Sequence, residues 1–320
     1  MLGARLALAG NDVSLIVRGA HLQAIARDGL TLIDPDGAQQ VAHPICVTDS
    51  LAQAGRQDLV ILALKAHQVA DVAPQLPLLL NATTRIVTMQ NGIPWWYFHR
   101  LAGPWQGTTL TSLDPDGSIA RHVPAERVIG SVVYPACEVV RPGVIQRVEG
   151  NRFSLGEPDS SDSSDVRAIS TVFKAAGLRA PVTSDIRSEI WLKVWGNLSF
   201  NPISALTHAT LEDICLFAPT RALASTMMTE AQAIGEKLGV RFKVSLDKRI
   251  AGAQAVGAHK TSMLQDVEQG RPLELQALVG SVAELGRITQ IPTPAIDAVW
   301  ALTGLLARTL QTHKARLRVD

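Results

Sequence analysis

MLGARLALAGNDVSLIVRG (residues 1–19) predicts a helix followed by a strand. Leu2 and Leu6 recur at helical spacing, Gly10 ends the helix, and the apolar run 13–17 is typical of a strand. In a doubly wound dinucleotide-binding fold, such a helix follows a first strand and a GxGxxG turn, whose backbone N–H groups cradle the pyrophosphate. Both would precede this stretch, so we expect a sheet without its first strand. An ordinary amphipathic helix and strand would show the same local pattern.

Short apolar runs alternate with helical patterns in the first half of the chain, which is the signature of a mostly parallel sheet. The alternating segments are DVSLIVR (12–18), GAHLQAIARDG (19–29), DLVILAL (58–64), KAHQVADVAPQLPLLL (65–80) and TRIVTMQ (84–90). Asp-Gly and Pro-Gly turns then separate β-rich runs in the segments 107–123 and 127–157. We expect these two segments to add antiparallel strands to one side of the sheet.

Helical periodicity replaces the strand pattern from Ser164 onward, after the polar loop EPDSSDSSD (157–165). The sequence therefore predicts two domains in an α/β protein. Residues 1–180 would form a nucleotide-binding domain with a Rossmann-like sheet, and residues 181–320 an all-helical domain that carries the substrate site.

Composition excludes several classes of function. The chain has 320 residues, 30 basic and 29 acidic side chains, and 47% hydrophobic residues, so nothing indicates a nucleic-acid surface. Its three cysteines lack any metal-ligand or disulfide spacing, and we expect no metal site. No apolar run is long enough to span a membrane, and the N-terminal stretch lacks a signal-peptide pattern. We expect a cytoplasmic protein that acts on a small molecule.

A polar stripe marks the segment SDIRSEIWLKVWGNLSFNPISAL (184–206). Glu189, Lys193, Asn197 and Asn201 are spaced four residues apart, so they project from one face of the predicted helix. A solvated face with a Glu189–Lys193 ion pair is the alternative explanation. Asparagine is a poor choice for such a face, because its side chain competes with the backbone. Pro202 should bend or break the helix just after Asn201.

Four further positions are candidate site residues. Lys65 and Asn91 each follow a predicted strand, and ligands of open α/β sheets bind outside the carboxyl ends of the strands. A surface lysine and a plain Asn-Gly turn are the alternatives. In HKTSMLQDVEQGRPLELQAL (259–278), Ser262 could serve as a capping hydroxyl and Glu274 as an ordinary first-turn acid, and neither is assigned a catalytic role from pattern alone.

The motifs together resemble the ketopantoate reductase family, the NADPH-dependent 2-dehydropantoate 2-reductases of pantothenate synthesis. The resemblance is carried by GARLALAGNDVSLIVRG (3–19), LALKAHQV (62–69), QNGI (90–93), IRSEIWLKVWGNLSFNPISAL (186–206) and TSMLQDVEQGRPLE (261–274). The KxxxNxxxNP pattern and the SMLQD segment are its specific parts. The resemblance implies a Rossmann-like domain followed by a helical domain of the 6-phosphogluconate dehydrogenase type. The family's first strand and GxGxxG turn are not matched here.

The resemblance also implies a role for each candidate. Lys193 matches the catalytic lysine that hydrogen-bonds the substrate ketone and supplies a proton as hydride arrives. Glu274 matches the acid that orients either Lys193 or the substrate hydroxyl. The substrate side would be formed by Asn197, Asn201 and Ser262, with Ser262 holding the carboxylate. Asn91 would lie near both nicotinamide and substrate, and Lys65 would contact the cofactor.

Arg18 indicates the cofactor. An NAD-binding enzyme places an acid at the end of the second strand to bind the ribose 2′-hydroxyl, whereas an arginine pairs with the 2′-phosphate of NADP. LIVRG (15–19) carries an arginine and no acid at that place, although a plain surface arginine would also fit. We therefore expect NADP(H) as the cofactor. The tryptophan-rich and helical surfaces permit a homodimer.

Two other functions fit part of the pattern. A hydroxy-acid dehydrogenase of the 3-hydroxyisobutyrate or 6-phosphogluconate type also uses a helical lysine followed four residues later by asparagine, but it usually carries a glycine-rich segment before that lysine. A non-catalytic NADP-binding remnant would explain the unmatched phosphate loop. Three tryptophans in NGIPWWYFHRLAGPWQG (91–107) either pack in the core or narrow the substrate pocket.

Overall fold

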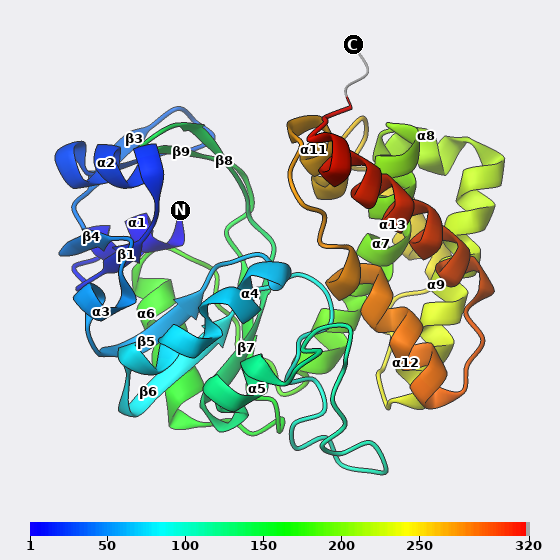
Figure 1. The fold of residues 1–320 in the computed structure, drawn as a ribbon, viewed down its shortest axis with the longest axis horizontal. Coiled ribbons are helices and arrows are strands. Elements are labelled where there is room, and N and C mark those ends of the chain that lie inside the picture. Colours follow the sequence, from blue (N-terminus) through cyan, green and yellow to red (C-terminus); the bar gives the residue numbers. More distant parts are fainter. Residues whose placement is uncertain (318–320) are drawn as a thin grey trace.

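The computed structural model describes residues 1–317. The strands all belong to the N-terminal part of the chain, and a purely helical part lies beside it (Figure 1). The strands are β1 Ser14–Ile16, β2 Leu30–Ile33, β3 Gln39–Ala42, β4 Cys46–Thr48, β5 Gln57–Leu62, β6 Leu80–Thr88, β7 Val128–Val133, β8 Ala136–Arg141, β9 Val144–Glu149 and β10 Phe153–Gly156.

The central sheet has the strand order β10-β7-β6-β5. Strands β5, β6 and β7 run parallel, and β10 is antiparallel to β7. The apolar runs predicted at 58–64 and 84–90 form β5 and β6. Val60 and Leu62 are buried in β5, and the second half of β6 is mostly buried, because helices cover the sheet. Around this sheet and its neighbours lie the helices α1 Leu2–Leu8, α2 Gly19–Asp28, α3 Leu51–Ala54, α4 Ala66–Val72, α5 Ser118–His122 and α6 Ser164–Ala175, and the 3₁₀ segments η1 Ala73–Leu79 and η2 Ala125–Arg127.

The opening helix and strand are confirmed as α1 and β1. Strand β1 pairs in parallel only with β4 in the described residues, and this pair forms a sheet of its own beside the central one. Arg18 lies two residues beyond the carboxyl end of β1 and is the N-cap residue of α2.

The prediction for the segments 107–123 and 127–157 is partly wrong. Only β10 is added antiparallel to the central sheet, whereas β8 and β9 form a hairpin in a separate sheet of order β3-β2-β9-β8, in which β9 runs parallel to β2. The segment 107–123 holds turns and α5 rather than strands. The carboxylate of Asp114 explains this, because it accepts hydrogen bonds from the backbone N–H groups of Ile119 and Ala120 and so caps the helix.

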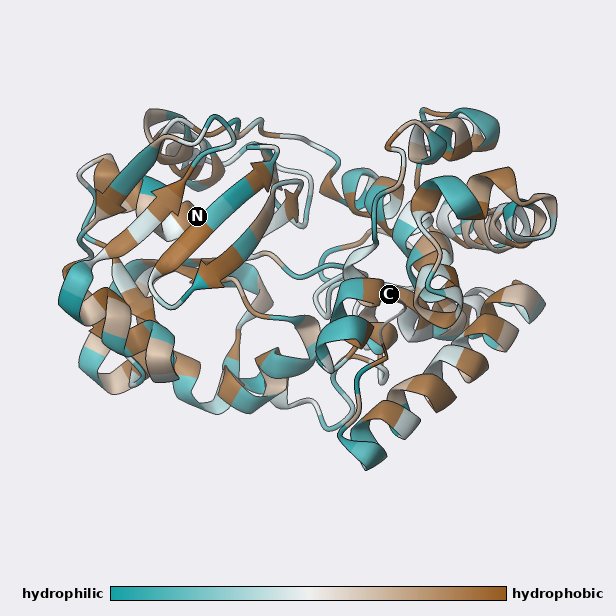
Figure 2. Ribbon diagram, turned by 90° about the horizontal axis from the view of Figure 1, so that it is seen from above, coloured by the Kyte–Doolittle hydropathy of each residue, from teal (hydrophilic) through white to brown (hydrophobic). Residues whose placement is uncertain are grey.

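The helical part is built around α7, which spans 22 residues and buries Trp191 and Trp195 completely. Its helices are α7 Ile186–Thr207, α8 Leu211–Leu216, α9 Ala218–Lys237, α10 Leu246–Gln254, α11 Ser262–Gln269, α12 Ser281–Thr289 and α13 Pro294–His313, with the π-helical segment η3 Gln276–Gly280 before α12. Most helices carry both hydrophobic and hydrophilic bands in Figure 2, as expected of helices with one face in a core.

Of the bend or break predicted at Pro202, the break is wrong, since α7 continues through this residue to Thr207. Proline removes one backbone donor from the helix. The neighbouring side chains of Phe200 and Ile203 are buried in the core of the helical part, and this packing outweighs the local preference.

Arg187 joins the two parts of the molecule. Its guanidinium donates to the carbonyl oxygens of Tyr97 (2.9 Å), His99 (2.7 Å) and Pro158, all of which belong to the N-terminal part.

The tryptophan-rich segment 91–107 lies in the same region. Trp96 is buried there, and its indole N–H donates a hydrogen bond of 2.9 Å to the hydroxyl of Thr88. The tryptophan-rich segment therefore contributes to the core, as the simpler of the two interpretations predicted. Within residues 1–317, no helix is both long and apolar enough to cross a membrane.

Candidate active site

Lys193 lies at the boundary between the two parts of the molecule. Its Nζ donates a hydrogen bond of 2.7 Å to the Oδ1 atom of Asn91 and a second one to the carbonyl oxygen of Val133. Asn91 follows β6 and Val133 ends β7, so the carboxyl ends of two parallel strands receive a lysine from α7. The polar stripe predicted on this helix therefore faces the edge of the sheet at which ligands of α/β folds bind.

Glu274 completes a polar chain around this lysine. Its Oε2 atom accepts a hydrogen bond of 3.5 Å from the Asn91 side-chain amide, and its Oε1 atom accepts one of 3.0 Å from the backbone N–H of Ala66. The carboxylate thus lies at the N-terminal end of α4, where the helix dipole favours negative charge. Asn91 connects Lys193 to Glu274 because its amide accepts from one and donates to the other.

Burial and the carboxylate act on Lys193 in opposite directions. Desolvation is the larger effect and lowers the pKa of Lys193 to about 8, while the charge of Glu274 raises it. A lysine with a pKa near 8 holds its proton at neutral pH and can still release it. This property suits a general acid.

Gly92 permits the close contact that brings Asn91 to this place. It has a φ of +92°, and the N–H of the next residue, Ile93, donates to the carbonyl oxygen of Ala277 in η3 at 3.0 Å. A Cβ atom on Gly92 would lie 2.1 Å from that oxygen. Only glycine combines this backbone conformation with so close an approach.

The side chain of Lys65 is bound to an acidic residue of the helical part, and its ammonium group is not free at the end of the strand. Its Nζ lies 2.5 Å from the carboxylate of Asp266, which is only 4% exposed and also pairs with Arg271 at 2.8 Å. Sequence reasoning missed Asp266. The available signal was an acid on the apolar face of α11, between the buried Leu264 and Val267.

The substrate-side candidates lie along the next turns of α7. The Asn201 side-chain amide donates to the hydroxyl of Ser262 at 3.4 Å, and Asn201 is buried while Ser262 is exposed at the start of α11. Asn197 is partly buried one helical turn beyond Lys193. The structure therefore brings Asn201 and Ser262 together, and α7 carries Asn197 between them and the lysine.

Arg18 lies apart from this cluster. It is exposed at the carboxyl end of β1, and none of the hydrogen bonds or ion pairs among residues 1–317 involves its guanidinium.

Glu189 does not form the ion pair with Lys193 that a solvated helix face would have. It pairs instead with Arg152 at 3.3 Å and accepts a hydrogen bond of 3.1 Å from the hydroxyl of Tyr134. The explanation of the polar stripe as a simple surface pair is therefore wrong.

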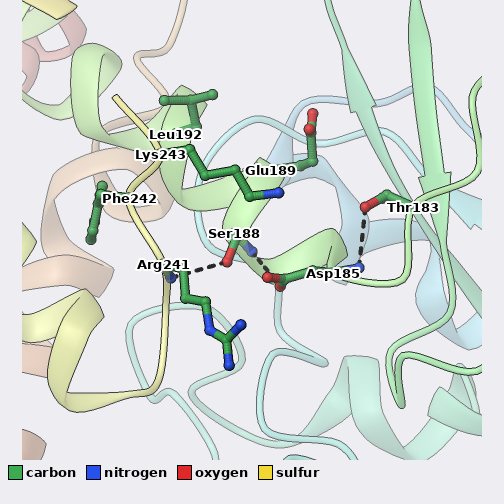
Figure 3. Close-up of a pocket in the computed structure, with 8 residues that line it drawn as sticks. All are labelled: Thr183, Asp185, Ser188, Glu189, Leu192, Arg241, Phe242 and Lys243. Carbon is green, nitrogen blue, oxygen red and sulfur yellow. Dashed lines mark hydrogen bonds between the residues drawn. The ribbon is translucent and has the colours of Figure 1, made fainter. Parts of the chain in front are cut away.

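A small cavity of about 50 Å³ lies on the flank of α7 (Figure 3). It is lined by Thr183, Asp185, Ser188, Glu189, Leu192, Arg241, Phe242 and Lys243. The acids in this lining already have partners: Asp185 caps α7 through the N–H of Ser188, and Glu189 holds the pairs described above. The cavity does not include Lys193.

The fold and the site define a class of protein: a nucleotide-binding α/β domain joined to a helical domain, with a lysine of low pKa between them. Residues 1–160 match the family described as Ketopantoate reductase PanE/ApbA, and residues 185–307 match its C-terminal domain. A 2-dehydropantoate 2-reductase from Mesorhizobium japonicum is 57% identical over 307 residues, which cover 96% of this chain and 94% of the relative. The chain belongs to the ketopantoate reductase family.

Two solved structures show the same fold. A protein from Ralstonia solanacearum, classed as a ketopantoate reductase, superposes with a TM-score of 0.91 at 42% identity and covers 96% of this chain and 94% of its own. D-Mandelate dehydrogenase, solved with NADH and anilino(oxo)acetate, superposes with a TM-score of 0.81 at 19% identity, over 97% and 95% of the two chains. At 19% identity, the similarity to D-mandelate dehydrogenase shows that the fold is shared and nothing more. The fold class predicted from the sequence is therefore confirmed.

Proposed function

We propose that this protein reduces 2-dehydropantoate (ketopantoate) to pantoate with NADPH, in the synthesis of pantothenate and coenzyme A. The observation that carries the proposal is the position of Lys193, whose ammonium lies at the carboxyl ends of β6 and β7 with a pKa near 8. The relative from Mesorhizobium japonicum, a 2-dehydropantoate 2-reductase, supports the choice of substrate.

Lys193 acts as the general acid in this proposal. Addition of hydride to a ketone develops negative charge on the oxygen, and a positioned ammonium stabilises this charge and then transfers its proton. Its hydrogen bonds to Asn91 and to the carbonyl of Val133 fix two of its three donor directions, which leaves one N–H for the substrate oxygen. Glu274 keeps the lysine protonated and holds Asn91 in place.

The other predicted residues would hold the substrate. The amides of Asn197 and Asn201 can donate to and accept from a hydroxyl or a keto acid, and the hydroxyl of Ser262 would bind the carboxylate. Asn91 would also contact the nicotinamide, because it lies three residues beyond the carboxyl end of β6.

The nicotinamide cofactor supplies the hydride when it is bound, and the residues at the strand ends fit it. The exposed guanidinium of Arg18 follows β1 at the place where a dinucleotide's ribose binds, and it is free to pair with a 2′-phosphate. This supports NADPH over NADH. Lys65 would contact the cofactor after it leaves Asp266, with which it pairs in this structure.

A second candidate function is the reduction of another small 2-keto acid by the same residues. The common fold with D-mandelate dehydrogenase supports it, since that protein was solved with anilino(oxo)acetate, which carries a carbonyl group next to a carboxylate as a 2-keto acid does. A non-catalytic NADP-binding role is the third candidate. The cytoplasmic location and the homodimer stay predictions.

The test is the rate of NADPH oxidation by the purified protein with ketopantoate, 2-ketoisovalerate and benzoylformate, each repeated with NADH. The proposal predicts the highest kcat/KM for ketopantoate with NADPH. Preference for another keto acid would transfer the assignment to the second candidate, and no turnover with any of them would favour the non-catalytic role.

A further inference from the structure

A second cation lies against α7 close to Lys193 and has no partner within residues 1–317. Arg249 extends from α10, and its side chain is partly buried. Its guanidinium makes no hydrogen bond or ion pair in the described part of the chain, and burial lowers its pKa from the ordinary value. No nitrogen of this guanidinium is among the fully buried, unpartnered polar atoms of residues 1–317, so its N–H groups reach the solvent and are free to bind an anionic ligand.

Gly196 is the reason that the guanidinium can lie there. A Cβ atom at this position would lie 2.2 Å from the Nη2 atom of Arg249, so the guanidinium occupies the space that any other residue would fill. Glycine within a helix lowers its stability relative to alanine. Gly196 follows Lys193 by three residues, which places the two cations about one helical turn apart along α7.

The acidic side chains on this flank do not neutralise Arg249. Glu189 pairs with Arg152 and Tyr134, and Asp185 caps the start of α7. Figure 3 shows both acids in the wall of the neighbouring cavity, with Lys243 and Arg241 opposite them. The side of α7 that faces this cavity and Arg249 therefore carries more positive than negative side chains.

The proposed reaction needs such a charge. A 2-keto acid presents a ketone oxygen and a carboxylate, and Lys193 is assigned to the ketone oxygen. Ser262 and Asn201, which lies two helical turns beyond Lys193, can donate hydrogen bonds but carry no charge. None of the residues assigned so far balances the charge of the carboxylate. An arginine binds a carboxylate through two parallel N–H donors, which gives both charge and orientation.

We propose that Arg249, seated against Gly196, binds the carboxylate of the substrate and makes the site selective for keto acids over their neutral analogues. This inference rests on the proposed function and deepens it, because it moves the main carboxylate contact from Ser262 to a charged residue. Ser262 and Asn201 would then bind the hydroxyl end of the substrate.

The test is a calorimetric titration of the protein, in saturating NADP⁺, with pantoate and with its neutral lactone. In Arg249→Met, the Kd of pantoate should rise about 30-fold, as expected for a lost hydrogen bond between charged groups, and that of the lactone less than about threefold. Gly196→Ala should act in the same direction, because the added methyl group displaces the guanidinium while alanine favours the helix. Arg241→Met, which removes a cation from the cavity wall, is the matched control and should leave both constants unchanged.

Equal weakening of both ligands, or an unchanged affinity of Arg249→Met for pantoate, would overturn the inference. If the unmodified protein binds neither ligand, the ketopantoate assignment fails by itself. The same variants are then titrated with mandelate and mandelamide, a hydroxy acid and its neutral amide. Loss of selectivity for the acid in Arg249→Met would support the role of Arg249, and equal affinities for acid and amide in the unmodified protein would refute it.

Discussion

The two ends of the site differ in how far the chain itself fixes their geometry. At the catalytic end, Lys193, Asn91 and Glu274 are already connected by hydrogen bonds that join the two parts of the molecule. At the cofactor end, Arg18 is exposed and has no partner within residues 1–317. The chain therefore fixes the proposed proton donor by its own hydrogen bonds, whereas the residue proposed to recognise the cofactor would be held in place only once its anion binds.

This difference follows from the chemistry at each end. A general acid is effective only when its pKa and direction are fixed, and this requires burial and hydrogen bonds. A residue that recognises a phosphate gains from remaining hydrated until the phosphate displaces water. The catalytic end should consequently be sensitive to small changes in packing, and the cofactor end mainly to changes in charge.

Lys193→Met should give the largest effect. We expect kcat for the reduction to fall about a thousandfold, because no other group replaces the proton donor. The Kd of NADPH, measured by fluorescence titration, should change less than about threefold, because the role of Lys193 lies in the transition state. Lys243→Met removes a nearby lysine and should leave kcat unchanged. Comparable losses in kcat and in cofactor binding would refute the assignment.

Gly92→Ala should lower kcat/KM about a hundredfold. The added Cβ would lie 2.1 Å from the carbonyl oxygen of Ala277, so Asn91 would be pushed away from Lys193. Gly239→Ala is the matched control, since Gly239 has a similar positive φ of +86° and no atom lies within 4 Å of the position that its Cβ would take. Both variants carry the same backbone strain. If they lose activity equally, the contact with Ala277 is not what positions the site.

Arg18→Asp should change the preference for NADPH over NADH by about 30-fold, the amount expected for a lost charged hydrogen bond. The ratio of kcat/KM for the two cofactors measures it. Arg27→Asp produces the same change of net charge on an exposed residue of α2 and should leave this ratio unaltered. An unchanged ratio in Arg18→Asp would remove Arg18 from the phosphate site.

Lys65→Met should give the smallest of these effects. The side chain is 30% exposed and already pairs with Asp266, so a contact to the cofactor replaces one ion pair by another. We expect the KM for NADPH to rise about fivefold, with kcat unchanged. Lys260→Met, which breaks the Lys260–Glu268 pair at 2.7 Å, serves as the control. A fall in kcat alone would show that Lys65 acts by docking the two parts of the molecule.

The elements could be predicted where one local pattern determines them. The alternation that predicted β5 and β6, and the spacing that placed Lys193, Asn197 and Asn201 on one helix, are both local properties of the sequence. The β8–β9 hairpin was expected, but its place was not. Its pairing with β2 joins segments more than a hundred residues apart, and nothing local specifies such a register.

Contacts between distant segments were also beyond local prediction. The pairing of Lys65 with Asp266 and the seat of Arg249 against Gly196 depend on how the two domains and the helices pack. At Pro202 the local pattern predicted a break that tertiary packing prevents. The buried side chains next to it in α7 keep the helix continuous.

The pH dependence of kcat/KM for ketopantoate reduction tests the central role of Lys193 most directly. The lysine must be protonated to act, so the rate should be constant at neutral pH and fall tenfold per pH unit above its pKa of about 8. The charge of Glu274 raises this pKa, so Glu274→Gln should move the falling limb to lower pH. A limb near pH 8 that moves down in Glu274→Gln is the predicted result. A profile without that limb, or one that Glu274→Gln leaves in place, would contradict the account.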